Sequence, residues 1–321
     1  MSGISCLLGT PEAQAKIRAW YQTQLAKPVP WDGKAIDHGK EILLVRGPAL
    51  MRLCQHPELG VQTSHDLLRL MQKQYTANGG KEGKDEKGNT VWTFGPAQVE
   101  IMEKLGMFKR SDFVVVPFEN LGSFPYSVLS YTWNDSKWRE LVLALQKRLP
   151  GMLEEGEEEE FFWLDIFCLD QFKADKMKSI FRSNEIYGWA VKYYVMGLAI
   201  FDRVWCLAET TCTGEKAQRR KEMIMVTDFE GFLDRREYAY KLAKLKSDPT
   251  FNDSRCTVES DRVIVEMRIL ESGFASVHDF DVYIKEVADE KMSPFREVSH
   301  HDAQHATAPQ CRPASACDSV C

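Results

Sequence analysis

The sequence predicts an α/β fold in which a parallel sheet carries helices on both faces, with further helical segments on either side. From Tyr126 onward, short apolar and β-branched runs alternate with segments of helical length. Strands separated by helices of this length pair in parallel, because each crossover returns the chain to the same end of the sheet. The runs are apolar almost throughout, which is typical of strands covered on both faces.

Each element of this α/β region has its own local signal. Strands are predicted where apolar residues run together, at residues 127–132, 161–167, 193–198 and 222–227. Helices are predicted where apolar positions recur at helical spacing, at residues 136–149, 174–189 and 201–213. An acidic run at 154–160 indicates a solvated loop. We expect residues 113–230 to form one α/β domain.

The flanking regions carry mainly helical patterns. Residues 1–112 are expected to be mostly helical, with helices at 11–25, 61–75 and 96–107, and short strands at 40–46 and 112–117. Residues 78–89 (NGGKEGKDEKGN) have no apolar anchor and predict an exposed loop. Residues 231–292 are expected to pack on the domain as a helical extension, with helices at 234–245, 259–271 and 277–288.

The last segment, 293–321, is rich in Pro, Ala, Ser, His and Cys and predicts a disordered tail. Its histidines and cysteines fit no standard zinc spacing, so we expect no metal site. Walker A and G-x-G-x-x-G patterns are absent from the sequence, so we expect no resident nucleotide cofactor.

Composition narrows the class of protein. The chain has 321 residues, of which 44% are hydrophobic and 27% charged, as in ordinary globular proteins. The formal net charge of −6 argues against nucleic acid as the main partner. No segment approaches the roughly 20 apolar residues of a membrane-spanning helix, and the N-terminus lacks the pattern of a signal peptide. Nine scattered cysteines favour a reducing compartment, so we expect a cytoplasmic protein without membrane contact.

Three blocks in this α/β region resemble known families. Residues 128–135 (VLSYTWND) are similar to the LSY-x-W opening of heterokaryon-incompatibility (HET) domains and to the first strand of TIR domains. Residues 162–171 (FWLDIFCLDQ) are similar to the W-x-D-x-x-C-I-x-Q block of the HET family. Residues 203–209 (RVWCLAE) resemble the R-x-W-C/T-x-x-E block of that family and the W-C-L-x-E motif of plant TIR domains.

The resemblance implies a flavodoxin-like, TIR-like fold and a site. In TIR domains that cleave NAD, the glutamate of the W-C-x-x-E helix is catalytic, which implies that role for Glu209. The loop after the first strand borders the same cleft, which implies substrate contacts for Thr132, Trp133 and Asp135. NAD or a related nucleotide would then be a substrate and not a cofactor.

The residues themselves support this chemistry. Trp205 and Glu209 are four positions apart on one helix and therefore neighbours on one face. A carboxylate there can stabilise the oxocarbenium-like state in which the nicotinamide–ribose bond breaks. Nicotinamide leaves as a neutral base, so a general acid is not required. Asp165, inside an apolar strand, is either a structural hydrogen-bond hub or part of this substrate site.

Two functions stay open. The first is a TIR-like NAD glycohydrolase, an NAD+ nucleosidase, that works on self-association as a homo-oligomer. The second is a non-enzymatic self-association or signalling module of a defence-type pathway, in which Glu209 is solvated or paired with Arg203 or Lys216. Trp163 is expected to be a core residue, whereas Trp133 and Trp205 are either core residues or contacts to the substrate.

Overall fold

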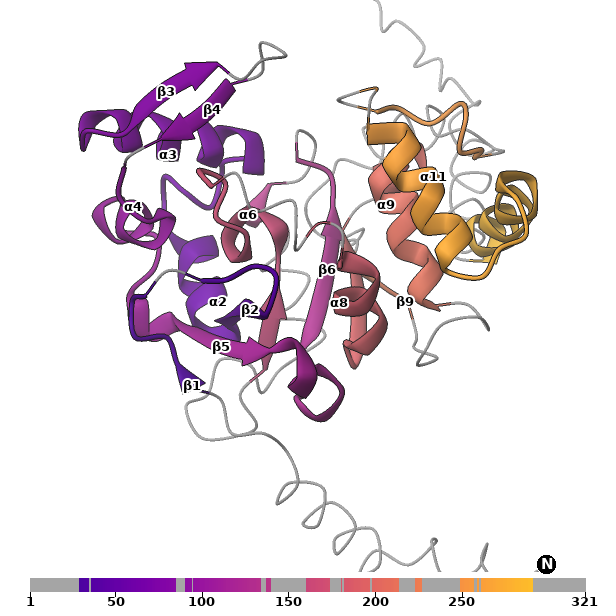
Figure 1. Ribbon diagram of the computed structural model, residues 1–321, viewed down its shortest axis with the longest axis horizontal. Helices are drawn as coiled ribbons and strands as arrows, with labels where there is room; N and C mark the ends of the chain where they lie inside the picture. Colours follow the sequence, from indigo (N-terminus) through magenta and orange to yellow (C-terminus); the bar gives the residue numbers. More distant parts are fainter. Residues whose placement is uncertain are drawn as a thin grey trace, which may run out of the picture.

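The fold was determined as a computed structural model (Figure 1). It describes residues 29–34, 36–84, 90–93, 95–133, 137–139, 160–173, 180, 182–196, 198–213, 223–226, 249–256, 259 and 261–290. Several expected features lie outside these residues: the helices at 11–25 and 234–245, most of the helix at 136–149, nearly all of the acidic run, Asp135, Lys216 and the segment 293–321.

The described strands form one large mixed sheet, so the chain belongs to the α/β class. Its order is β1-β5-β2-β7-β6-β8-β9. The strands are β1 (Val29–Pro30), β2 (Glu41–Arg46), β5 (Phe113–Pro117), β6 (Ser127–Tyr131), β7 (Phe161–Trp163), β8 (Lys192–Met196) and β9 (Met223–Val226).

Only one half of the sheet is parallel. Strands β7, β6, β8 and β9 run in the same direction, whereas β1, β5 and β2 pair antiparallel and β2 joins β7 antiparallel. The four strands predicted from residue 126 onward are therefore parallel, as expected, but the sheet as a whole is mixed because β1, β5 and β2 extend it in antiparallel pairing. An apolar run shows that a strand is buried but carries no information about the direction of its partner.

The sheet also crosses the expected domain boundary at residue 112. In β2, Leu44 pairs with Val114 and Val45 pairs with Phe162. The Leu44, Val45 and Phe162 side chains are completely buried. Residues 41–46 thus belong to the same sheet and core as the strands after residue 112. Residue 112 is therefore not a boundary between two separate folding units.

Most described helices lie within predicted ones, with shorter bounds in places, but a helix at 47–55 was not predicted and a helix at 165–168 replaces the end of the strand expected at 161–167. The described helices are α2 (Gly47–Gln55), α3 (Ser64–Ala77), α4 (Gln98–Lys104), α6 (Asp165–Cys168), α8 (Ser183–Trp189), α9 (Val204–Glu209), α11 (Asp261–Glu271) and a helical segment at 277–290. The 3₁₀ turns are η2 (Arg110–Asp112), η3 (Phe118–Ser123), η4 (Leu198–Asp202) and η5 (Thr210–Thr213). In α3, Thr63 and Asp66 form a reciprocal capping box that begins the helix.

The expected loop at 78–89 contains a strand instead. Strands β3 (Lys81–Lys84) and β4 (Thr90–Thr93) pair as an antiparallel hairpin. Its anchor is Trp92, whose ring lies 5.4 Å from Tyr75 and 5.5 Å from Phe172, centroid to centroid. One aromatic beyond the polar run therefore holds an otherwise exposed hairpin against α3.

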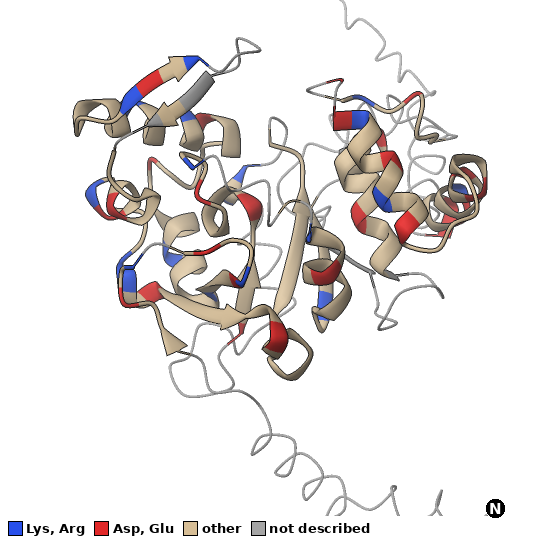
Figure 2. Ribbon diagram, viewed as in Figure 1, with Lys and Arg blue, Asp and Glu red and all other residues tan. Residues whose placement is uncertain are grey.

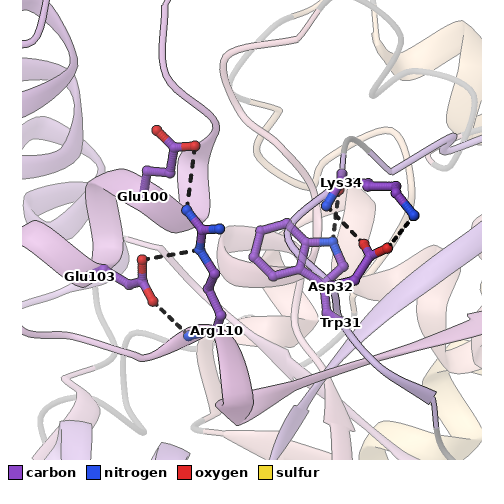
Figure 3. A network of polar contacts seen from close by, with 6 residues as sticks. All are labelled: Trp31, Asp32, Lys34, Glu100, Glu103 and Arg110. Atoms are coloured by element: carbon purple, nitrogen blue, oxygen red, sulfur yellow. Dashed lines mark hydrogen bonds and ion pairs between the residues drawn. The ribbon is translucent and has the colours of Figure 1, made fainter.

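Polar contacts secure the first described segment (Figure 3). The Trp31 indole donates a 2.8 Å hydrogen bond to the carbonyl of Lys34, and the Arg110 guanidinium lies 6.0 Å from the Trp31 ring. Arg110 also pairs with Glu100 and Glu103 of α4. These ion pairs are partly exposed, so they orient the segment more than they stabilise it.

The charged residues do not gather in one part of the described structure. Acidic and basic residues are interspersed over the described elements, and the central strand β6 contains neither (Figure 2). Within the part of the chain that the structure describes, every helix is too short or too polar to cross a membrane.

We expect Leu44→Ala to destabilise the entire sheet. Leu44 is fully buried, and removing its side chain leaves a cavity that costs about 2–5 kcal/mol of unfolding free energy. Urea unfolding followed by fluorescence and circular dichroism should show one transition at a lower midpoint. Val61→Ala, at an exposed position, is the control. Two separate transitions, with only one displaced, would contradict a sheet shared across residue 112.

Candidate active site

Strand β6 is the point at which the winding of the sheet reverses. Its neighbours are β7 on one side and β8 on the other, both parallel to it. In open α/β sheets, ligands bind beyond the carboxyl ends of the strands at such a reversal. Thr132 and Trp133 directly follow β6, with Thr132 buried and Trp133 half-buried.

Asp165 lies at the start of α6 and collects the polar groups at the end of β6. Its carboxylate accepts hydrogen bonds from the Tyr131 hydroxyl at 2.5 Å, the Trp133 indole at 3.0 Å and the Ile166 amide at 2.7 Å. Burial raises the pKa of Asp165, while these donors act in the opposite direction. The contacts are those of a structural hub that joins β6 to α6, one of the two interpretations left open for this residue.

Two glutamines hold the loop after α6: Gln171, which ends the second sequence block, and Gln98, which was not predicted. The Gln171 side chain donates to the Asp165 carbonyl at 2.8 Å, and the Gln171 amide donates to the Gln98 side chain at 2.7 Å. The Gln98 side chain in turn donates to the Ile166 carbonyl at 2.9 Å. Gln98 is buried at the start of α4, and a polar residue on this apolar helix face was the signal for it.

Glu209 ends α9, and its carboxylate lies against the sheet. It accepts a hydrogen bond from the Ser130 hydroxyl of β6, and it hydrogen bonds with the Tyr187 hydroxyl of α8. Burial raises the pKa of Glu209 to about 8, and the charge of Asp165 acts in the same direction. The carboxyl group is therefore mainly protonated at pH 7, because a low-dielectric site disfavours its charged form.

A pocket of about 120 Å³ adjoins this carboxyl group, between α8, the end of α9 and α11. It is lined by Glu209, Tyr187 and Arg268, together with small polar side chains such as Ser183 and Asn184. The volume is below the roughly 300–1,000 Å³ of complete small-molecule sites, so the pocket fits one group of a ligand.

Arg268 of α11 is the second charged residue of the pocket and was not predicted. It is only 4% exposed, and its Nη1 donates to the Ser183 hydroxyl. Burial lowers the pKa of Arg268 to about 10, which leaves it cationic at pH 7. Its position in the sequence could have indicated that it is buried. Arg268 lies three residues after Val265 and directly before Ile269, both of which are buried on the apolar face of the helix.

Trp205 lies beneath this arginine. Its ring centroid is 4.9 Å from the Arg268 guanidinium carbon, and its indole donates to the Asp261 carboxylate at 3.3 Å. Trp205 thus contacts α11, whereas the Glu209 carboxylate contacts Ser130 of β6, and Glu209 but not Trp205 lines the pocket. Trp163 is a core residue, 3% exposed.

The predicted site residues therefore form two groups. Tyr131 and Ser130 are consecutive in β6, and consecutive side chains of a strand point to opposite faces. Tyr131 contacts Asp165, whereas Ser130 contacts Glu209. Trp133 and Asp165 accordingly share one cluster, and Glu209 belongs to another, across the strand.

Comparison of the chain with family models, curated proteins and solved structures found no match. Within the described residues, no group of three or more His, Cys, Asp or Glu side chains has the arrangement of a metal site.

We expect the stability difference between Glu209→Gln and the wild type to change with pH. The folded-state pKa of about 8 lies above the ordinary value of 4.5, so the folded protein retains a proton that the unfolded chain loses. This stabilisation is complete below pH 4.5 and declines as the pH rises through 8. Because glutamine cannot ionise, the variant should gain on the wild type with rising pH.

Urea unfolding at several pH values measures this difference directly. Glu266→Gln changes an exposed glutamate of α11 and serves as the control. A difference between Glu209→Gln and the wild type that stays constant from acid to alkaline pH would show that Glu209 titrates normally.

Proposed function

We propose that the chain is a TIR-like or HET-like glycohydrolase that cleaves the nicotinamide–ribose bond of NAD or a related nucleotide, with Glu209 as its catalytic carboxylate. The observation that carries this proposal is a carboxyl group of raised pKa that lines a pocket together with a buried arginine. Perturbed titratable groups in a pocket are characteristic of active sites.

The topology supports the same family. In chain order, the parallel strands β6, β7, β8 and β9 are the first to fourth, and their spatial order is second, first, third, fourth. Flavodoxin-like sheets begin in this way. Glu209 lies on the helix that follows the third of these strands, within the W-C-x-x-E pattern.

In the proposed reaction, the ionised Glu209 lies beside the ribose as the C–N bond breaks. The bonding electron pair leaves with nicotinamide, which becomes a neutral base, and positive charge develops on the ribose. The oxygen of a water molecule then bonds to the anomeric carbon and its proton passes to solvent. Ser130 and Tyr187 orient the carboxylate through their hydroxyl groups.

The raised pKa of Glu209 has a consequence for this chemistry. A pyridinium ring is cationic, and an opposite charge nearby favours the ionised carboxylate. The substrate would thus promote the ionisation that its own cleavage requires. In the free protein the reactive form is the minor one at pH 7, which limits turnover at and below neutral pH.

We expect Glu209→Gln to lower the release of nicotinamide from NAD by at least about a hundredfold without unfolding the protein. The kcat/KM of the wild type should rise with pH and level off above about 8, where Glu209 is ionised in the free enzyme. Chromatography of nicotinamide and circular dichroism of each variant test this, with Glu266→Gln as the control.

The proposed enzyme works on self-association, so the assay uses concentrated protein. Intact NAD after prolonged incubation of the concentrated wild type would overturn the proposal. Equal activity of Glu209→Gln and the wild type would overturn the role of Glu209.

A second function, a self-association module, is favoured by the outer face of α11. Val263, Met267 and Leu270 are 63%, 56% and 41% exposed, and their spacing places them on one stripe of the helix. Contiguous exposed apolar side chains are typical of interaction surfaces. In this function the stripe pairs with the same stripe of a second copy, and Glu209 contributes only to the core.

We expect Met267→Asp to weaken self-association, because it places a charge in the centre of the apolar stripe. Sedimentation velocity at increasing concentration measures this, with Arg69→Asp on the exposed surface of α3 as the control. A wild type that stays monomeric at its highest soluble concentration would contradict the module.

A further inference from the structure

Arg268 is the only lysine or arginine among the described residues that is buried. Only 4% of its surface is exposed to solvent. A buried guanidinium is tolerable only if its donors find acceptors, because an uncompensated buried charge strongly destabilises a protein. The partners of its nitrogen atoms therefore decide what this residue is for.

Only part of the guanidinium is satisfied by the protein. Nη1 donates to the Ser183 hydroxyl, and one face lies over the Trp205 ring. Nε and Nη2 are buried and have no hydrogen-bond partner among the residues that the structure describes. These two nitrogens form one edge of the planar group, the edge that binds two oxygens of a carboxylate or phosphate side by side.

Neighbouring carboxyl groups do not take this edge. Glu209 is hydrogen bonded with Ser130 and Tyr187, and its raised pKa leaves it mostly neutral at pH 7. Glu271, which also lines the pocket, is exposed to solvent, and its charge raises the pKa of Arg268 less than the charge of Glu209 does. The cationic Arg268 is thus buried beside a mostly neutral carboxyl group. Its Nε and Nη2 can therefore donate to an oxyanion.

The pocket supplies a place for that oxyanion. Arg268 lines it, as does Ser183, whose hydroxyl accepts from Nη1 and keeps its own proton for donation. About 120 Å³ accommodates one phosphate-sized group. Nε and Nη2 are shielded from solvent, so entry of the anion includes a local adjustment of α11, the helix that carries Arg268.

We propose that this pocket binds the phosphate group of a sugar phosphate, held by Nε and Nη2 of Arg268, while Glu209 faces the sugar. The identity of the sugar as ribose rests on the proposed function, whereas the phosphate site rests on Arg268 alone. In this arrangement α11, outside the blocks that resemble known families, supplies the residue that distinguishes phosphorylated from unphosphorylated ribosides.

Isothermal titration of the full chain at pH 7 tests the proposal with three probes: ribose 5-phosphate, ribose and inorganic phosphate. We expect ribose 5-phosphate to bind at least about tenfold more tightly than ribose or inorganic phosphate, because only it uses both halves of the site. Arg268→Met should weaken its binding by at least about tenfold, and Arg268→Lys should restore part of it, because lysine lacks the paired edge.

Thermal unfolding separates binding from a purely structural role. Removing a buried cation with unsatisfied donors should leave Arg268→Met as stable as the wild type or more stable without ligand. The same variant should lose the rise in Tm that ribose 5-phosphate gives the wild type. Arg69→Met, at an exposed arginine, should retain that rise.

Each contrary result has a distinct meaning. Absence of ribose 5-phosphate binding, or equal binding by Arg268→Met, overturns the phosphate site. Equal binding of ribose 5-phosphate and inorganic phosphate overturns the sugar phosphate as its ligand. Binding that depends on Arg268 in a protein that leaves NAD intact supports the phosphate site and overturns the glycohydrolase. Cleavage of nicotinamide mononucleotide with unchanged KM in Arg268→Met overturns the phosphate site and supports the glycohydrolase.

Discussion

The hydrogen bond from Ser130 to Glu209 is the contact on which the candidate site depends. It holds the carboxyl group at the end of α9 against β6, where Glu209 is partly buried. Removal from water raises the pKa of Glu209 and makes the group largely neutral at pH 7. That neutrality in turn allows the cationic Arg268 of α11 to remain beside it without forming an internal ion pair, so the cation stays available to an outside anion.

Strand geometry decides which acidic residue belongs to the pocket. Ser130 and Tyr131 are adjacent in β6 and point to opposite faces, so they separate Glu209 from Asp165. Both carboxyl groups are buried enough to have raised pKa values, yet their surroundings differ. Asp165 is enclosed by three donors and organises the end of β6, whereas Glu209 borders open volume. A raised pKa alone would not distinguish them.

Local sequence patterns predicted the elements better than their partners. The β-branched run of β5, the alternating α/β pattern from β6 to β9 and the helical spacing of apolar residues in α3 are local signals, and the structure confirms these elements. The antiparallel direction of β2 and the hairpin anchored by Trp92 depend on residues far apart in the sequence. Glu209 was found by its motif, but Arg268 and Gln98 were missed because a single polar residue on an apolar helix face does not reveal its partner.

A direct titration of Glu209 tests the account most directly. The protein labelled with ¹³C at glutamate side-chain carboxyls gives a set of NMR resonances, and the one absent from Glu209→Gln belongs to Glu209. We expect this resonance to titrate with a midpoint near 8. A midpoint near the ordinary value of 4.5 would show that the carboxyl group is solvated, and would contradict both the buried site and the chemistry proposed for it.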